Sequence, residues 1–143
     1  MIKEDCSLCT IIHEKYRVVQ TSDLVYSVIP HAPLFDGHVM VLPKSHSKMK
    51  DLCMQETYEL NNMIYTLKDT LVRMYPDNHP FIFTLGDTDH ASISEHLHYH
   101  LVPSKVGIRT LTSTYYQLDS KYEVAPEDVL TNMATKLRDA LNS

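Results

Sequence analysis

The chain has 143 residues, a length that fits one domain with a single core, and its 43% hydrophobic and 22% charged residues are ordinary for a globular protein. Its formal net charge of −5 gives no general attraction to nucleic acid or anionic lipid, so neither is expected as a partner. No apolar run is long enough to span a membrane, and residues 1–5 are charged where a secretory signal would be apolar. We therefore expect a cytoplasmic protein with reduced cysteines.

Five short strands are predicted from runs of apolar or alternating residues. They cover residues 17–21, 24–29, 38–43, 81–85 and 95–103. The first two are joined at Ser22-Asp23 as a hairpin. The third is almost wholly apolar, which predicts a central place in the sheet.

Apolar residues at helical spacing predict two helices. The longer one follows the third strand and ends near Met74, with Ser47 or Asp51 as its N-cap and Cys53 in the core. The second covers residues 126–141, with a proline and two acids in its first turn.

These elements predict an α+β fold, in which an antiparallel five-stranded sheet carries both helices on one side. Residues 110–117 are predicted as a further strand or an extended arm. We expect a single domain over residues 1–143, with the motif-bearing part at 6–103 and a C-terminal extension that contains the last helix.

Three histidines alternate with apolar residues in the fifth predicted strand. This period of two places His96, His98 and His100 on one face of a strand. Side chains two residues apart on a strand are roughly 6.5–7 Å apart, so neighbouring rings suit an extended ligand better than one small ion. A single strand histidine is usually a buried residue bonded to the backbone, but three in alternation favour a polyanion such as a nucleoside phosphate.

Cys6 and Cys9 form a C-x-x-C pair near the N-terminus. Two thiolates at this spacing can hold one zinc ion, although the pair alone fits two ordinary cysteines equally well. If the third strand lies beside the fifth, His46 comes close to His96 and a closed structural zinc site is complete. Its four ligands are then Cys6, Cys9, His46 and His96.

An imidazole that is free of metal and faces a phosphate can attack phosphorus, because a histidine of ordinary pKa is largely unprotonated at neutral pH. The attack gives a covalent nucleotidyl-histidine and divides one difficult displacement into two easier ones. Candidates to stabilise the charge on the non-bridging oxygens are backbone amides, His100 and the hydroxyls of Ser92 and Ser94.

These motifs resemble the landmarks of the histidine triad superfamily of nucleotide hydrolases and transferases. The similar segments are Cys6-x-x-Cys9, residues 37–46, Ala91-Ser92 and residues 96–102. The resemblance covers residues 6–103 and implies the α+β fold of that family, with a purine nucleotide as ligand and a homodimer with a continuous ten-stranded sheet. The Ala91-Ser92 stretch is most similar to the dinucleoside polyphosphate hydrolases and phosphorylases.

The resemblance also implies a role for each histidine. His98 matches the nucleophile and His100 matches the histidine that contacts the phosphate. The zinc-bearing branch of the superfamily binds its metal at the positions of Cys6, Cys9, His46 and His96. His38, in the Gly-His segment, is included among the candidate nucleotide-binding residues.

Several positions depart from the family pattern. Pro30 stands where many relatives have an Asp or Asn that holds the ribose hydroxyls, and Asp36 is the candidate to replace it. Thr84, His90 and Ser104 replace an Asn, a Gly and an Arg. The altered contacts put sugar recognition in doubt, while the nucleophile is intact.

Three functions therefore remain open. The leading hypothesis is a nucleotide hydrolase or transferase that acts through a His98 adduct, and the alternative is a non-catalytic nucleotide-binding protein on the same scaffold. A third is a metal-dependent hydrolase whose triad binds a catalytic metal. Against it, the acids of the preceding loop, Asp87, Asp89 and Glu95, show no recognisable ligand spacing.

Overall fold

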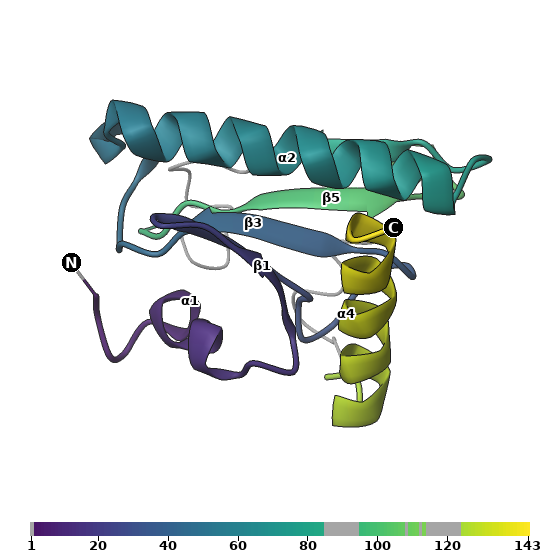
Figure 1. The fold of residues 1–143 in the computed structure, drawn as a ribbon, viewed down its shortest axis with the longest axis horizontal. Helices are drawn as coiled ribbons and strands as arrows, with labels where there is room; N and C mark the ends of the chain where they lie inside the picture. Colours follow the sequence, from purple (N-terminus) through teal and green to yellow (C-terminus); the bar gives the residue numbers. More distant parts are fainter. Residues whose placement is uncertain (1, 85–94, 108, 112, 114–123) are drawn as a thin grey trace.

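The structure, a computed structural model, describes residues 2–84, 95–107, 109–111, 113 and 124–143 (Figure 1). Within these ranges, no helix combines the length and the apolar character that crossing a membrane requires. Five antiparallel strands form one sheet in the order β1-β2-β3-β5-β4. The strands are β1 (Val18–Thr21), β2 (Val25–Val28), β3 (Val39–Pro43), β4 (Pro80–Phe83) and β5 (Tyr99–Pro103). The predicted five-stranded sheet is confirmed, with β3 in the middle.

The histidine strand is shorter than predicted. β5 begins at Tyr99, so only His100 of the three histidines lies within the regular ladder. The residues before β5 are held by the segment that follows β3, because the Leu97 N–H donates to the Ser47 carbonyl oxygen at 2.8 Å. His96 and His98 therefore stand at the entry to β5, where each ring can be oriented independently of strand pairing.

The long helix α2 (Met54–Met74) begins later than predicted, and both predicted N-caps are wrong. Cys53 is the N-cap: its Sγ accepts the Glu56 N–H at 3.5 Å, and the Glu56 carboxylate accepts the Cys53 N–H at 3.0 Å. This reciprocal pair is a capping box, and Glu56 in the first turn also favours the positive end of the helix dipole. Because Cys53 serves as the cap, it is exposed rather than in the core.

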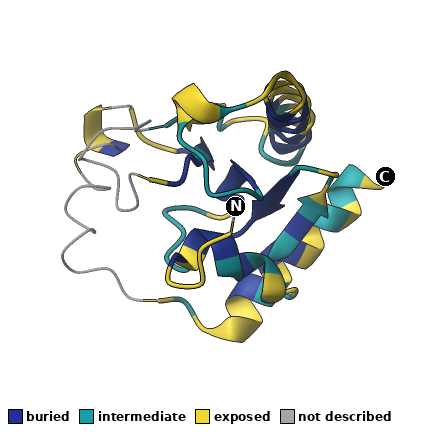
Figure 2. Ribbon diagram, turned by 90° about the vertical axis from the view of Figure 1, so that its left-hand side faces the viewer, coloured by how far each residue is buried: buried dark blue, intermediate teal, exposed yellow. Residues whose placement is uncertain are grey.

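The second helix, α4 (Glu127–Leu141), has Pro126 as its N-cap. Both helices cover the same face of the sheet, as predicted, and their apolar sides form one core with the sheet (Figures 1 and 2). The buried residues of this core are Val19, Val25, Ile29, Val39, Val41, Leu60, Met63, Ile64, Leu67, Leu71, Leu97, Leu101, Leu130, Met133, Ala134 and Leu137. The strand predicted from residue 110 is wrong where the structure describes it, because residues 109–111 and 113 are helical.

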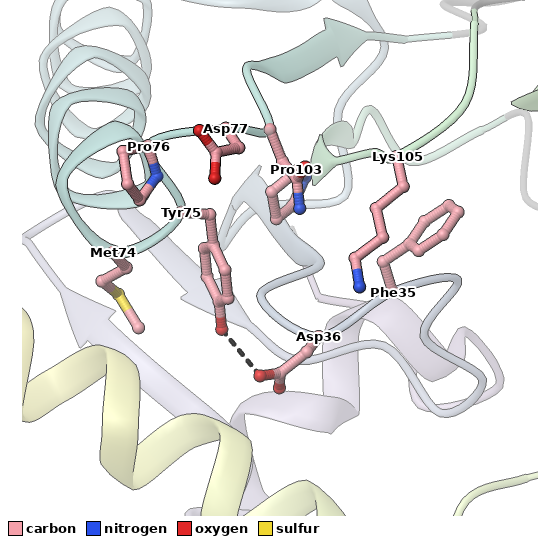
Figure 3. Close-up of a pocket in the computed structure, with 9 residues that line it drawn as sticks. Phe35, Asp36, Met74, Tyr75, Pro76, Asp77, Pro103 and Lys105 are labelled. Carbon is pink, nitrogen blue, oxygen red and sulfur yellow. Dashed lines mark hydrogen bonds between the residues drawn. The ribbon is translucent and has the colours of Figure 1, made fainter.

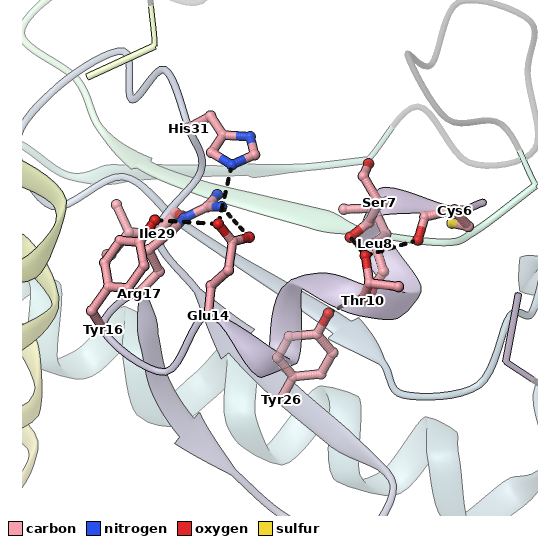
Figure 4. Close-up of polar contacts among 10 residues, drawn as sticks. All are labelled: Cys6, Ser7, Leu8, Thr10, Glu14, Tyr16, Arg17, Tyr26, Ile29 and His31. Carbon is pink, nitrogen blue, oxygen red and sulfur yellow. Dashed lines mark hydrogen bonds and ion pairs between the residues drawn. The ribbon is translucent and has the colours of Figure 1, made fainter. Parts of the chain in front are cut away.

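The N-terminal segment covers part of the opposite face. The short helix α1 (Ser7–Thr10) and the 3-10 turn η1 (Ile11–His13) pack on β2 and β3. The Tyr26 hydroxyl of β2 donates to the Leu8 carbonyl oxygen at 2.6 Å, which fixes α1 to the sheet (Figure 4).

After η1 the chain is anchored by the fully buried Arg17. Its Nε donates to the Ile29 carbonyl oxygen at 2.9 Å and its Nη1 to the Glu14 carboxylate at 3.0 Å (Figure 4). Since β1 starts at the next residue, these bonds hold the N-terminal segment and the end of β2 in a fixed relation. The part of this face left by α1 and η1, over β3, β5 and β4, carries His100, which pairs with Met40 and with Phe83.

Candidate functional site

Four cysteine and histidine side chains meet at the edge of α1. The possible ligand atoms of Cys6, Cys9, His46 and His96 all lie within 4.8 Å of one another. Cys9 Sγ is 3.4 Å from Nδ1 of both His46 and His96, and Cys6 Sγ is 3.6 Å from His96 Nδ1. The structure thus brings together the four residues predicted as zinc ligands.

These distances fit a tetrahedral metal. Zinc binds sulfur at about 2.3 Å and nitrogen at about 2.05 Å, so a tetrahedral site places a sulfur and a nitrogen ligand about 3.5 Å apart. The observed separations of 3.4–3.6 Å match that value. Burial raises the pKa of the Cys6 thiol, and a bound cation would reverse this effect by favouring the thiolate.

The orientation of the His96 ring also suits a metal ligand. Its Nε2 lies 2.8 Å from the Pro43 carbonyl oxygen, and because a carbonyl only accepts, Nε2 carries the proton. Burial lowers the pKa of His96 to about 4, so the ring is neutral and Nδ1 has a free electron pair. That atom faces the two thiols. A proton on the nitrogen away from the metal, held by a backbone carbonyl, is the usual arrangement for a metal-bound histidine.

His98 has the opposite arrangement. Its Nδ1 lies 2.9 Å from the His96 carbonyl oxygen, so Nδ1 carries the proton and donates it. Burial lowers the pKa of His98, which keeps the ring neutral and leaves the electron pair on Nε2. The backbone of His98 is held in turn by Thr84, whose hydroxyl donates to the His98 carbonyl oxygen at 2.7 Å. Only 6% of His98 is exposed. Its ring is not part of the cysteine cluster, the group formed by Cys6, Cys9, His46 and His96.

His38 and His100 form a buried pair on the same face of the sheet. The Leu34 N–H donates to His38 Nδ1 at 3.0 Å, so the proton of neutral His38 is on Nε2. That Nε2 lies 2.9 Å from His100 Nδ1 and donates to it. The proton of neutral His100 is therefore on Nε2, which makes this atom a donor. Burial lowers the pKa of His38 to about 3 and that of His100 well below its ordinary value, so both rings are neutral.

Phe83 also packs against His100. The two rings are stacked, with centroids 5.0 Å apart and an angle of 18° between their planes. The His98 ring meets the His100 ring edge to face at 5.2 Å. His100 is thus held between a flat apolar ring and its two histidine neighbours, in one orientation. Phe83 was not predicted as a site residue, and Thr84 was noted only as a replacement for an Asn of the family pattern. The end of the predicted fourth strand was a signal for the position of both.

Asp36 lies elsewhere. Its carboxylate accepts a hydrogen bond from the Tyr75 hydroxyl at 2.8 Å (Figure 3). It accepts another from the Lys136 ammonium of α4. These donors hold its pKa below the ordinary value even though burial opposes this. The side chain lines a cavity of about 560 Å³ formed with Phe35, Pro103 and the end of α2. No described contact joins Asp36 to the histidines.

The remaining candidates divide into two groups. Ser92, Ser94 and His90 lie outside the described residues. Pro30 is buried at the end of β2, and the buried Ser104 hydroxyl donates to the Val106 carbonyl oxygen at 3.0 Å, so neither presents a charged group.

The antiparallel sheet with α2 and α4 on one face, together with His96 and His98 at the entry to β5 and His100 within it, defines a protein of the histidine triad superfamily. Within it, the chain belongs to the family described as proteins similar to the CwfJ C-terminal region, whose profile matches residues 1–117.

Relatives and solved structures agree with this assignment. The chain is 36% identical over 94 residues to an AP-4-A phosphorylase of Mycobacterium tuberculosis, a match that covers 63% of this chain and 47% of the relative. The chain thus spans about half the length of the curated relatives it matches. A Hit-like protein from Bartonella henselae superposes with a TM-score of 0.75 at 17% identity, over 98% of this chain and 99% of that one. A zinc-bound histidine triad protein from Mycobacterium smegmatis gives 0.69 at 17% identity, over 96% and 94%. These two similarities concern the fold alone.

Proposed function

We propose that this protein is a nucleotide hydrolase or transferase that cleaves a phosphoanhydride or phosphoramidate bond of a purine nucleotide through a covalent adduct on His98. One observation carries the proposal: the His96 carbonyl oxygen holds the proton of His98 on Nδ1, which leaves the electron pair of a neutral imidazole on Nε2. A nucleophile of this kind needs no further base to remove a proton before it attacks.

The reaction takes two steps. In the first, His98 Nε2 forms a bond to phosphorus and the bond from phosphorus to the leaving group breaks, with the electron pair going to the leaving oxygen or nitrogen. In the second, water or another acceptor attacks phosphorus, the P–N bond breaks and its electron pair returns to His98, while the proton of the attacking water passes to solvent. His100 donates from Nε2 to a non-bridging oxygen in both steps, because His38 holds its Nδ1.

For the substrate we propose a dinucleoside polyphosphate or a nucleoside phosphoramidate. The proposal is supported by the sequence similarity to an AP-4-A phosphorylase, which includes 63% of this chain. The net charge of −5 means that the phosphates must be held by local donors rather than by the general field of the protein.

We also propose a structural zinc ion on Cys6, Cys9, His46 and His96. A closed set of two thiolates and two imidazoles leaves no position for substrate, so the metal would stabilise the fold rather than take part in the reaction. The ion would join the N-terminal helix α1 to the entry of β5. Its thiolate ligands require a reducing compartment, which supports a cytoplasmic location.

Trapping of the adduct tests the proposed function. The protein is mixed with phosphate-labelled diadenosine tetraphosphate or adenosine phosphoramidate, quenched in alkali and analysed by mass spectrometry. We expect a nucleotidyl group on the peptide that contains His98, stable in alkali and lost in acid. Wild-type turnover in a His98→Ala variant that keeps its circular dichroism spectrum would contradict the proposal.

A specific observation favours a second candidate, a nucleotide-binding protein without turnover. Pro30 provides no carboxylate for a ribose, and the Asp36 carboxylate is already bonded to Tyr75 and Lys136. Under this alternative, AMP binds to wild-type protein in calorimetry, while neither diadenosine tetraphosphate nor adenosine phosphoramidate is cleaved.

We further propose a homodimer with a continuous ten-stranded sheet, formed through β4. This strand is at an edge of the sheet and its Ile82 is 41% exposed, whereas α4 packs against the strand at the other edge, β1. An exposed apolar side chain on an edge strand is a typical point of association. Light scattering is expected to give a dimer mass for wild-type protein and a monomer mass for Ile82→Lys.

A further inference from the structure

Glu95 precedes the metal-ligand candidate His96 in the chain and faces the ring of another candidate, His46. One of its carboxylate oxygens lies 3.5 Å from His46 Nε2 and 3.7 Å from the Lys3 ammonium. The side chain of His46 is 8% exposed, whereas that of Glu95 is 61% exposed. The carboxylate thus lies at the rim of the cysteine cluster, between a buried ring and the N-terminal segment.

The His46 ring lacks a bond that the proposed site requires. Its Nδ1 faces Cys9 Sγ at 3.4 Å, so Nδ1 is the atom that would bind a metal. The proton of the neutral ring is then on Nε2, a donor that is buried and makes no hydrogen bond. An unpaired buried donor is unfavourable, and metal-bound histidines almost always donate their second N–H to a carboxylate, a carbonyl or water.

The other histidine of the cluster shows what is missing. His96 donates its Nε2 proton to the Pro43 carbonyl oxygen at 2.8 Å, a bond of ordinary length made to the main chain of β3. The acceptor available to His46 among the described residues is the Glu95 carboxylate, at 3.5 Å. A modest rotation of an exposed side chain closes this distance.

We propose that Glu95 is a positioning residue of the metal centre. Its carboxylate accepts a hydrogen bond from the Nε2–H of His46 when the metal is bound, and so holds the ring with Nδ1 toward the ion. The inference rests on the proposed zinc site. A bound cation polarises the imidazole and makes its N–H a stronger donor, which favours the shorter contact.

The contact between Lys3 and Glu95 is a different matter. Both side chains are largely exposed, at 43% and 61%, and exposed ion pairs contribute little. If the carboxylate acts on the metal centre, its effect comes through His46 and not through Lys3. Removing Lys3 therefore separates a positioning role of Glu95 from a surface ion pair.

The test measures zinc affinity by competition with a chromophoric chelator, using the full chain at pH 7.5. Removal of an outer carboxylate weakens metal binding roughly 10–100-fold, and we expect this loss in Glu95→Ala. Glu95→Gln should keep most of the zinc affinity, because its side-chain carbonyl oxygen can still accept a hydrogen bond from His46. Lys3→Ala and Asp69→Ala, a change in an exposed ion pair on α2, should remain close to wild type.

A second readout follows the ligand geometry. Cobalt substituted for zinc gives visible bands that report a tetrahedral thiolate and imidazole site, and we expect them to shift in Glu95→Ala but not in Asp69→Ala. If wild-type protein bound no zinc, the proposed metal site would fail. If wild type bound zinc and Glu95→Ala bound it with equal affinity and an unchanged cobalt spectrum, the role of Glu95 would be overturned while the metal site stood.

Discussion

His96 and His98 are two residues apart, yet the structure turns their rings to opposite uses. His96 donates from Nε2 to the Pro43 carbonyl oxygen and presents Nδ1 to two thiols. His98 donates from Nδ1 to the His96 carbonyl oxygen and presents Nε2. In each case a backbone carbonyl decides which nitrogen keeps its electron pair. The comparison shows that the acceptor beside each ring, rather than the residue type, decides which nitrogen is left to face the proposed metal region, around Cys6 and Cys9, or the proposed reactive region, around His98 and His100.

The two regions are also joined. The carbonyl that orients His98 belongs to the residue whose ring lies in the cysteine cluster. A metal that fixed His96 would therefore fix the acceptor of His98 as well. The His98 ring is oriented by the backbone of His96 but lies outside the proposed ligand set, so variants in the two proposed regions are expected to differ in kind.

The largest expected effect separates the two regions directly. His98→Asn should lower kcat by roughly 10⁴-fold, because it removes the nucleophile while its amide can still donate to the His96 carbonyl oxygen. Zinc content and the unfolding midpoint should stay near wild type. His96→Asn should instead lose zinc and have a lower unfolding midpoint. The checks are steady-state kinetics, metal analysis and thermal unfolding of both variants, and equal loss of zinc in both would refute the division.

The next largest effect is expected when zinc is removed from the cysteine cluster, and it concerns the stability of the fold. If zinc binds the folded state alone, the free energy of unfolding should fall by about 4 kcal/mol on going from free zinc at 1,000 times its Kd to excess chelator. Cys9→Ser should be less stable and insensitive to the chelator. Urea unfolding with and without chelator measures this difference, and identical midpoints for wild-type protein in the two conditions would contradict a structural metal.

The parts of the fold that depend on local pattern could be predicted, and those that depend on distant partners could not. Apolar and alternating runs predicted the strands of the sheet. The meeting of four metal-ligand candidates was predicted from the C-x-x-C spacing together with the assumption that the third strand lies beside the fifth. The cap of α2 was wrong because Cys53, a poor cap by residue type, is completed by Glu56 three residues later. Asp36 was assigned to the nucleotide as the replacement for the ribose-binding residue of the family. Its contact with Lys136, 100 residues away, was not predicted, because nothing local indicates it.

Within the reactive region, His38 is expected to act through His100. His38→Leu removes the bond to His100 Nδ1, so the proton of His100 is no longer held on Nε2 and the loss of that donor should lower kcat roughly 10²-fold. His38→Gln can still donate through its amide and should keep more activity. Kinetics of the two variants measure the difference. Equal activity of the Leu and Gln variants would show that the bond is without consequence.

The same buried pair predicts that the stability of the fold depends on pH. The pKa of His38 is about 3 in the folded protein and about 6.5 in the unfolded chain, so below pH 6.5 the unfolded chain binds more protons. Stability is therefore fully present above pH 6.5 and is lost as the pH falls toward 3. Between pH 7 and pH 5 the loss from His38 is about 2 kcal/mol.

Urea unfolding of chelator-treated protein at pH 7 and pH 5 measures this dependence. The side chain in His38→Gln cannot titrate. Between pH 7 and pH 5 the free energy of unfolding of this variant should therefore fall by about 2 kcal/mol less than that of wild type. His100, whose pKa is lowered by burial and also by His38, contributes in the same direction in both proteins but less in the variant, so the difference between them should be at least that large. Parallel pH curves for wild type and His38→Gln would mean that His38 is not held neutral.

The smallest expected effect concerns the loop that carries His38. Gly37 has φ of +91°, and a Cβ there would lie 2.8 Å from both the Pro103 and the Tyr75 side chains. Gly37→Ala should cost about 1.5 kcal/mol of backbone strain, and relief of the contacts should shift the loop. Gly107→Ala is the matched control, since nothing lies within 4 Å of its added Cβ. Because His38 follows Gly37 directly, kcat should fall in Gly37→Ala and zinc affinity should not. A loss of zinc affinity in Gly37→Ala would show that the two regions are coupled more tightly than their separate hydrogen bonds indicate.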